Sequence, residues 1–142
     1  MNLKKILKLH AEWLKNSEKG ARADLSRADL ANLRSRHSIV PEIGEFIVFK
    51  KLTSSAIATL LVTADSKRVG GLLGRKCRVS KAKVLEISGG LEKDYDKRTG
   101  KLLYQVGKCV EPDSFDDDIT KECTNGIHCF ITRKEAEEYD AN

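Results

Sequence analysis

The sequence predicts an α+β fold, in which a mostly antiparallel sheet lies between a helix at the amino terminus, followed by a short repeat remnant, and a helix at the carboxyl terminus. Two observations predict this class. Apolar residues recur at helical spacing only near the two ends of the chain, whereas residues 45–131 alternate or form short apolar stretches separated by turn residues. Several strands in succession, bracketed by helices, are typical of α+β proteins.

The composition indicates one globular domain with a small appendage. The chain has 142 residues, of which 40% are hydrophobic and 33% charged, as in an ordinary folded protein rather than a disordered one. The longest apolar stretch, residues 56–62, is far shorter than the roughly 20 residues that cross a bilayer. The amino terminus has no signal-peptide core. We therefore expect a cytoplasmic protein without membrane contact, with its four cysteines as reduced thiols.

The first predicted element is a helix over residues 3–15. Asn2 is a favourable N-cap residue, and Gly20 is a natural stop after the helix. One face is apolar or aromatic at the spacing i, i+3, i+4, i+7, and it consists of Leu3, Ile6, Leu7, His10, Trp13 and Leu14. This spacing predicts that His10 and Trp13 pack on a neighbouring element rather than contact a ligand.

Residues 23–30 contain two copies of the pattern Ala-Asp-Leu-x-x, in which five residues form one side of a square, right-handed β-helix. A third copy would need Ala at position 33 and Leu at position 35, but the sequence has Leu33 and Ser35 there. The same residues also suit a continued helix, so this alternative stays open. We expect residues 1–33 to form one unit, a helix plus a pentapeptide-repeat remnant with Leu25 and Leu30 in its core, and residues 34–44 to form a polar connector.

From residue 45 onward the pattern is that of strands. We expect strands over residues 46–49, 56–63, 77–87, 102–110 and 126–131, the third with a kink near Ser80. The glycine pair within residues 69–73 predicts a loop or bend there. Thr132 and Glu135 form a capping box that opens a helix over residues 133–139. Residues 45–142 are thus expected to form the α+β domain.

Several segments of this domain together carry a resemblance. They are Phe49-Lys50-Lys51, the turn at 64–68, Arg75-Lys-Cys-Arg78, Tyr104-x-Val-Gly107, the loop at 112–118, and Glu122-Cys-x-x-Gly-Ile-His-x-Phe-Ile-Thr-Arg. Residues 45–139 resemble the uncharacterised C-terminal domain of pentapeptide-repeat proteins of phages and large DNA viruses. The Cys-x-x-Gly-Ile-His segment is also similar to the ending of some phage lysis-inhibition accessory proteins. The resemblance implies a phage or prophage protein but no particular activity.

Charge is segregated along the chain, which has a net charge of +5. Residues 50–83 contain nine bases and one acid, a net charge of +8, whereas residues 111–142 contain ten acids and three bases, a net charge of −7. The two halves can pair within the molecule or form solvated faces, or they can meet a partner, including a second copy of the chain through the opposite charges.

The basic segment is the candidate ligand site. Arginine forks and lysine point charges both suit phosphate oxygens. The predicted ligand-binding residues are Lys67, Arg68, Arg75, Lys76, Arg78, Lys81 and Lys83. Few aromatic residues are interleaved with them, which weakens a nucleic-acid interpretation, and no glycine-rich loop opens a helix here.

Cys123 and His128 suggest a rival hypothesis, an enzyme in which the imidazole activates the thiol. The sequence identifies no third residue to orient His128, so we expect both side chains to be structural, with Cys123 held in the turn at Gly126. Metal binding by Cys109, Cys123, His128 and Cys129 does not match the short paired spacings that are usual in zinc sites. In addition, residues 128 and 129 are adjacent and would point to opposite faces of a strand. We predict neither a metal nor another cofactor.

The resulting hypothesis is a phage or prophage accessory protein that binds an anionic, phosphate-bearing ligand, a nucleotide or nucleic acid. By analogy with the family such a protein counters host defence. Two alternatives stay open: the Cys123–His128 enzyme, and a structural or interaction protein that assembles through its oppositely charged surfaces.

Overall fold

The computed structural model describes residues 2–23, 39–70, 75–119, 121 and 123–139. The chain divides into two compact units, residues 1–33 and residues 34–142. Leu25 and Leu30, the predicted core of the repeat remnant, lie outside the described residues.

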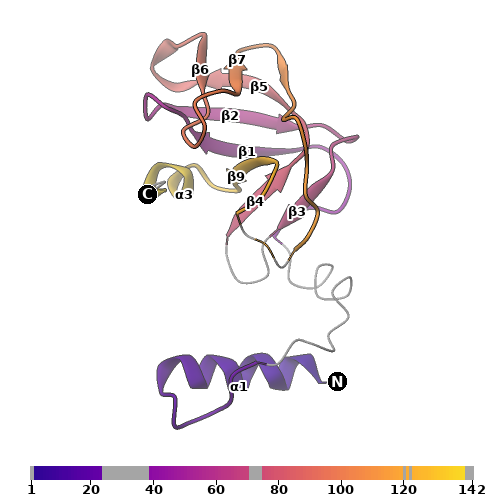
Figure 1. Cartoon of the computed structure of the whole chain (residues 1–142), viewed down its shortest axis with the longest axis vertical. Helices are drawn as coiled ribbons and strands as arrows, with labels where there is room; N and C mark the ends of the chain where they lie inside the picture. The colour runs from indigo at the N-terminus through magenta and orange to yellow at the C-terminus, as the bar shows by residue number, and fades with distance from the viewer. Residues whose placement is uncertain (1, 24–38, 71–74, 120, 122, 140–142) are drawn as a thin grey trace. The chain divides into compact units, whose positions relative to one another are not determined.

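In the first unit, helix α1 spans Leu3–Lys15, as predicted (Figure 1). The side chain of Asn2 caps it, because Asn2 Oδ1 accepts a hydrogen bond of 3.1 Å from Lys5 N. The chain then turns back along the helix at Gly20, where φ is +77° and a Cβ atom would clash with Leu9 O. Only glycine fits this close return.

The second unit is built on a seven-stranded sheet with the order β3-β4-β9-β1-β2-β5-β8 (Figure 1). All its paired strands are antiparallel, which confirms the predicted α+β class. The strands are β1 (Phe46–Lys51), β2 (Ile57–Val62), β3 (Arg68–Gly70), β4 (Lys76–Val79), β5 (Ala82–Ile87), β8 (Cys109–Val110) and β9 (Ile127–Phe130). The remaining elements are the hairpin β6 (Lys93–Tyr95) and β7 (Leu103–Gln105), the 3₁₀ turn η1 (Ser88–Gly90) and helix α3 (Arg133–Glu138).

The predicted single strand over residues 77–87 is wrong. The chain forms β4 and β5, which pair with different neighbours on opposite sides of the sheet. The break is fixed by the turn that precedes β3: Ser80 N donates to Lys67 O at 2.9 Å, and Lys81 N donates to Ser66 Oγ at 3.1 Å. These partners lie 13 and 15 residues away in the sequence, so the local alternation could not reveal the break.

Two other predicted boundaries also change. Residues 68–70, expected in a loop or bend, form β3, which pairs with β4. The expected strand over residues 102–110 is divided into β7 and β8 by a turn at Gly107, whose φ is +83°. Gly107 N donates to Val84 O at 2.8 Å, so the turn is held against β5.

The core lies on one face of the curved sheet. Its fully buried side chains come from β1, β2, β4, β5 and β9 and include Val48, Leu60, Val79, Val84, Cys129 and Ile127. Tyr104 of β7 joins this cluster and is itself fully buried, so the β6–β7 hairpin closes one end of the core.

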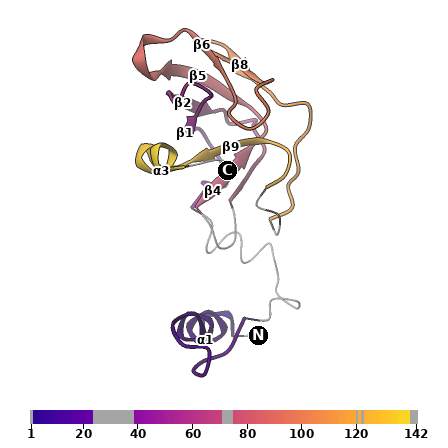
Figure 2. The same cartoon turned by 60° about the vertical axis from the view of Figure 1, so that its left-hand side comes forward.

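The hairpin is attached to the end of β1. Leu52 forms an isolated bridge with Asp96, and Thr53 N donates to Tyr95 O at 3.0 Å. Helix α3 follows β9 and packs against β1 (Figure 2). Thr132 Oγ1 caps this helix by accepting from Glu135 N, as predicted. The end of β1 is therefore surrounded by elements distant in sequence. Within the described residues, no helix has the length and apolar character needed to span a membrane.

Candidate functional site

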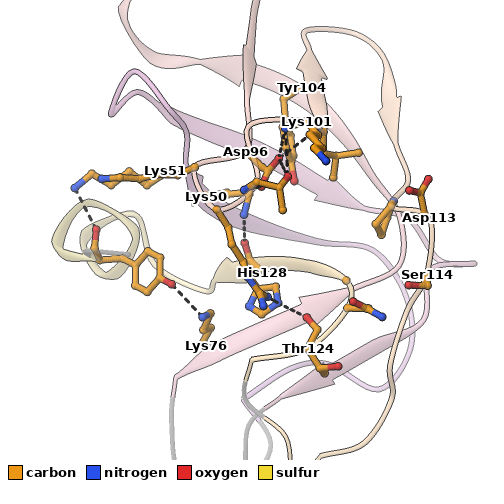
Figure 3. A pocket seen from close by; sticks show the side chains of 18 of the residues that line it. Lys50, Lys51, Lys76, Asp96, Lys101, Tyr104, Asp113, Ser114, Thr124 and His128 are labelled. Carbon is orange, nitrogen blue, oxygen red and sulfur yellow. Dashed lines mark hydrogen bonds between the residues drawn. The ribbon is translucent and has the colours of Figure 1, made fainter. Parts of the chain in front are cut away.

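A cavity of about 470 Å³ opens where β1, β4 and β9 meet the β6–β7 turn (Figure 3). The residues that line it include six cations and two carboxylates among the described part of the chain. The cations are Lys50, Lys51, Lys76, Lys97, Arg98 and Lys101, and the carboxylates belong to Asp96 and Asp113. Aromatic rings of Tyr104, Phe130 and Tyr139 form much of the apolar wall. The cavity is thus cationic with an aromatic lining.

Lys50 extends from β1 into this cavity. Its Nζ donates to the main-chain oxygen of His128 at 2.9 Å and lies 5.8 Å from the centroid of the Tyr104 ring (Figure 3). Burial lowers the pKa of Lys50 to about 8, an effect that Lys76 and Arg98 reinforce and that Asp96 opposes. A sizeable fraction of this amine is therefore neutral close to physiological pH.

His128 lies on β9 beside the amine. Its Nε2 lies 2.5 Å from Thr124 O, so this nitrogen carries the proton and donates a hydrogen bond to the carbonyl oxygen. Burial is the main cause that lowers the pKa of His128 to about 4. The positive charges of Lys76, Lys50 and Arg98 act in the same direction and the hydrogen bond to Thr124 opposes them, so the ring is neutral at pH 7. Its Nδ1 is buried and has no hydrogen-bond partner among the described residues.

Tyr104 contributes a second unpartnered polar atom to the cavity wall. Its side chain is 0% exposed, and within the described part of the chain its hydroxyl has no hydrogen-bond partner. Burial raises the pKa of Tyr104 well above its ordinary value, and the nearby carboxylate of Asp96 raises it further. The hydroxyl is therefore a neutral donor. A buried hydroxyl without a partner usually costs free energy, which makes it a candidate for function.

Asp96 shapes the rim of the cavity rather than neutralising it. Its carboxylate accepts hydrogen bonds from Thr99 N, Thr99 Oγ1, Lys101 N and Leu102 N, at 2.7–3.2 Å. Burial raises the pKa of Asp96, but these hydrogen bonds outweigh that effect and the pKa lies below its ordinary value. The turn that Asp96 organises presents exposed Arg98 and Lys101 at the cavity mouth.

Lys51 and Lys76 organise the opposite wall. Lys51 Nζ donates to Glu137 O at 3.0 Å and to Tyr139 O at 3.2 Å, which holds the end of α3 at the cavity (Figure 3). Lys76 Nζ donates to the hydroxyl of Tyr139 at 3.1 Å and lies 4.9 Å from the centroid of its ring. Tyr139 is thus positioned as a wall by two of the lysines.

The predicted basic site is divided by the fold, and two of its arginines are interior. Arg68 is 5% exposed, and its guanidinium donates to main-chain oxygens that include Gly44 O at 2.6 Å and Thr63 O at 2.9 Å. Arg78 is 3% exposed and donates to Asp116 O, Asp118 O and Lys121 O. Both arginines anchor loops, and their buried position is not that of a surface phosphate ligand.

The other five predicted residues lie in different places. Arg75 pairs with Glu135 at 2.6 Å and Lys81 with Asp65 at 3.1 Å, whereas Lys67 and Lys83 are exposed away from the cavity. Lys76 alone of the seven lines the cavity. The basic and acidic segments partly pair within the molecule, through Arg75 with Glu135 and through Arg78 with the carbonyls of the acidic loop.

Cys123 and His128 have other partners. The thiol of Cys123 is exposed and lies 3.3 Å from Lys76 Nζ, while His128 Nε2 contacts Thr124 O. The expectation that Cys123 is held inside the turn at Gly126 is therefore wrong, because residues 123–126 form a surface bend. His128 contributes to the cavity, whereas Cys123 is not one of the residues that line it.

The four cysteines are free thiols: Cys77 and Cys129 are buried opposite each other on β4 and β9, and Cys109 and Cys123 are exposed. Within the described ranges, no group of three or more His, Cys, Asp or Glu residues is placed to hold a metal ion.

Sequence reasoning missed most of the cavity. Lys50 and Lys51 were counted in the basic segment but not assigned to a site, and Lys97, Arg98 and Lys101 belong to a hairpin that was not predicted. One local signal was present: Asp96-x-x-Thr99-Gly100 is a typical turn pattern flanked by bases.

The fold and the cavity define a class, a small α+β protein with a cationic, aromatic-lined pocket. The chain belongs to a family of unknown function, DUF5758, whose match covers residues 36–136. This confirms an uncharacterised family over the expected domain. No curated protein and no solved structure matches the chain.

Proposed function

We propose that the protein binds a small anionic, phosphate-bearing ligand in the cavity at the end of β1. The observation that supports this most is the excess of cations, since six basic side chains and two carboxylates line about 470 Å³ among the described residues. One of the carboxylates, Asp96, uses its oxygens to hold the β6–β7 turn. A bound anion would balance the excess of positive charge among these described residues.

The shape of the site favours a small molecule over a nucleic acid. Cavities of roughly 300–1,000 Å³ with apolar walls and a few polar groups are typical of small-molecule sites. The aromatic wall of Tyr139 and Phe130, whose ring centroids are 5.3 Å apart, suits a planar group beside the phosphate. A nucleotide has both parts. In contrast, the exposed bases Lys67 and Lys83 lie outside the cavity and do not continue it.

Calorimetric titration with pyrophosphate, AMP and uncharged adenosine tests the proposal. The double variant Arg98→Ala/Lys101→Ala removes two exposed cations from the rim, and we expect it to weaken AMP binding by about tenfold or more, since hydrogen bonds to charged groups contribute about 1.5–3 kcal/mol each. Lys67→Ala/Lys83→Ala is the matched control with the same change in charge, and it should bind as the unmodified protein does.

Two results contradict the proposal. One is the absence of binding for both phosphate-bearing probes. The other is an equal loss of affinity in the two double variants, which would indicate a diffuse electrostatic surface. Binding of a single-stranded oligonucleotide that both variants weaken equally would favour the nucleic-acid alternative.

We also propose that the protein is of phage or prophage origin and acts in the host cytoplasm, as an accessory protein that counters host defence. The two Ala-Asp-Leu-x-x copies in residues 23–30 and the four free thiols support this. The test compares phage plating on a defended host that expresses either the protein or the Arg98→Ala/Lys101→Ala variant. Equal plating with the protein, with the variant and with an empty vector contradicts the proposed role.

A further inference from the structure

The amine of Lys50 has an unusual set of neighbours. Its recorded hydrogen bond goes to a neutral acceptor, the main-chain oxygen of His128. Among the described residues, no carboxylate forms an ion pair with it. The charge of Asp96 favours the ammonium form, but the oxygens of this carboxylate accept hydrogen bonds from the turn at residues 99–102. The ammonium form of Lys50 is therefore poorly compensated.

Two further cations, Lys76 and Arg98, also disfavour the charged form. A lysine that is desolvated and placed beside other cations is the arrangement that activates an amine as a nucleophile. With a pKa of about 8, about 9% of the amine is neutral at pH 7, compared with about 0.03% for a lysine of ordinary pKa 10.5. The difference in the reactive form is about 300-fold.

We propose that Lys50 Nζ forms a reversible imine with an aldehyde or ketone that also bears a phosphate group, held in the cavity. The inference rests on the proposed function, because the rim cations Arg98 and Lys101 are assigned to the phosphate. It adds a covalent step and narrows the ligand class to phosphorylated carbonyl compounds.

The step balances without a further reagent. The lone pair of the neutral amine attacks the carbonyl carbon, and the oxygen takes a proton to give a carbinolamine. The carbinolamine then loses its hydroxyl group as water, which carries away both hydrogens of the amine and leaves a C=N bond. Nothing is oxidised or reduced. The neutral imidazole of His128 and the hydroxyl of Tyr104 line the same cavity and supply an acceptor and a donor for the proton movements.

A matched pair of probes tests the inference. Pyridoxal 5′-phosphate carries an aldehyde, and pyridoxine 5′-phosphate carries an alcohol at the same position. Each is incubated at a limiting concentration with the full chain, reduced with borohydride and mapped by peptide mass spectrometry. We expect the pyridoxal probe to modify Lys50 about tenfold more than Lys67 or Lys83 at pH 7, because burial and the neighbouring cations favour the neutral, nucleophilic form of Lys50. The pyridoxine probe should give no adduct.

The pH profile and a variant complete the test. Modification of Lys50 should rise with pH and level off above about pH 8, the pKa of its amine. Lys50→Arg keeps a cation in the cavity and should abolish the selective adduct while retaining binding of pyridoxine 5′-phosphate. Because the unmodified protein itself reports the labelled position, a folding defect in the variant does not remove the test.

Four outcomes overturn the inference. Labelling spread evenly over the lysines, or a Lys50 profile that still rises beyond pH 9, shows that the amine is not activated. Calorimetric binding of both probes without an adduct on Lys50 leaves the proposed function in place and rejects the imine. Failure of both probes to bind while AMP still binds rejects a phosphorylated carbonyl ligand and leaves the proposed function in place.

Discussion

Replacing Lys50 by methionine should stabilise the protein at neutral pH while weakening anion binding. Methionine keeps the length of the side chain and removes the ammonium from its partly buried position on β1. The pKa of Lys50 is about 8 instead of 10.5, and this lowering corresponds to about 3 kcal/mol.

Two effects reduce this figure. Water in the cavity screens the ammonium, and the substitution removes the hydrogen bond from Nζ to His128 O, which contributes about 1 kcal/mol. We therefore expect Lys50→Met to raise the free energy of unfolding by about 1–2 kcal/mol at pH 7.

The pH dependence identifies the cause. Between pH 8 and pH 10.5 the unfolded chain keeps the Lys50 proton while the folded chain has lost it, so the stability of the unmodified protein increases with pH across this window. The Met variant lacks this increase. Its advantage should therefore be largest below pH 8 and disappear toward pH 10.5.

Urea unfolding at pH 7, 8, 9 and 10 measures the difference directly. Lys83→Met is the matched control, since Lys83 lies exposed on β5 and its ammonium stays in water. A Met variant that is less stable at every pH, or a difference that does not change with pH, would refute the reasoning.

Three other predictions concern charge and exposure. The unmodified protein should lose about 2 kcal/mol of stability as the pH falls from 6.5 to 4, because His128 binds a proton in the unfolded chain but stays neutral in the folded one, where its pKa is about 4. The variant His128→Gln should not show this loss. Urea unfolding that gives the same loss in both proteins contradicts the prediction. Arg78→Met should lower the free energy of unfolding by about 2–4 kcal/mol, since three main-chain oxygens lose their buried donor, and a change under about 0.5 kcal/mol would show that the loop does not depend on it. Iodoacetamide should modify exposed Cys123 in the native protein at a rate that His128→Ala leaves unchanged. Cys77 and Cys129 are buried and should react only on unfolding, and burial raises the pKa of Cys77 to about 12. Mass spectrometry of timed samples measures both rates.

The parts of the fold that were predicted correctly depend on neighbours in sequence. Asn2 and Thr132 cap their helices through bonds to residues three positions away, which a sequence pattern contains in full. The apolar, β-prone stretches at residues 46–49 and 56–63 are likewise local signals, and they form β1 and β2. The division of residues 77–87, in contrast, depends on Ser66 and Lys67, and no local pattern reports a partner 13 residues away.

The site was harder to predict for a similar reason. The sequence predicts a ligand-binding surface from bases on a strand and on the loop before it. In the fold, the guanidinium groups of Arg68 and Arg78 instead donate to main-chain oxygens of other segments and are buried. Lys50 is partly buried because the hairpin at residues 93–105 folds over the end of β1. The pKa of Lys50 is thus a property of the tertiary fold, and composition gives no indication of it.

The cations that line the cavity are better evidence for a ligand than the bases of the 50–83 segment that lie outside it. Arg68 and Arg78 are buried and hold loops through main-chain oxygens, and Arg75 and Lys81 pair with carboxylates. Inside the cavity, by contrast, the charges of Lys76 and Arg98 lower the pKa of Lys50 and that of His128. A folded protein that keeps such repulsion beside an open cavity is destabilised by it, unless an anion binds there and restores the balance of charge. The repulsion is therefore the feature that a bound phosphate would relieve, and it links the stability of the protein to its proposed ligand.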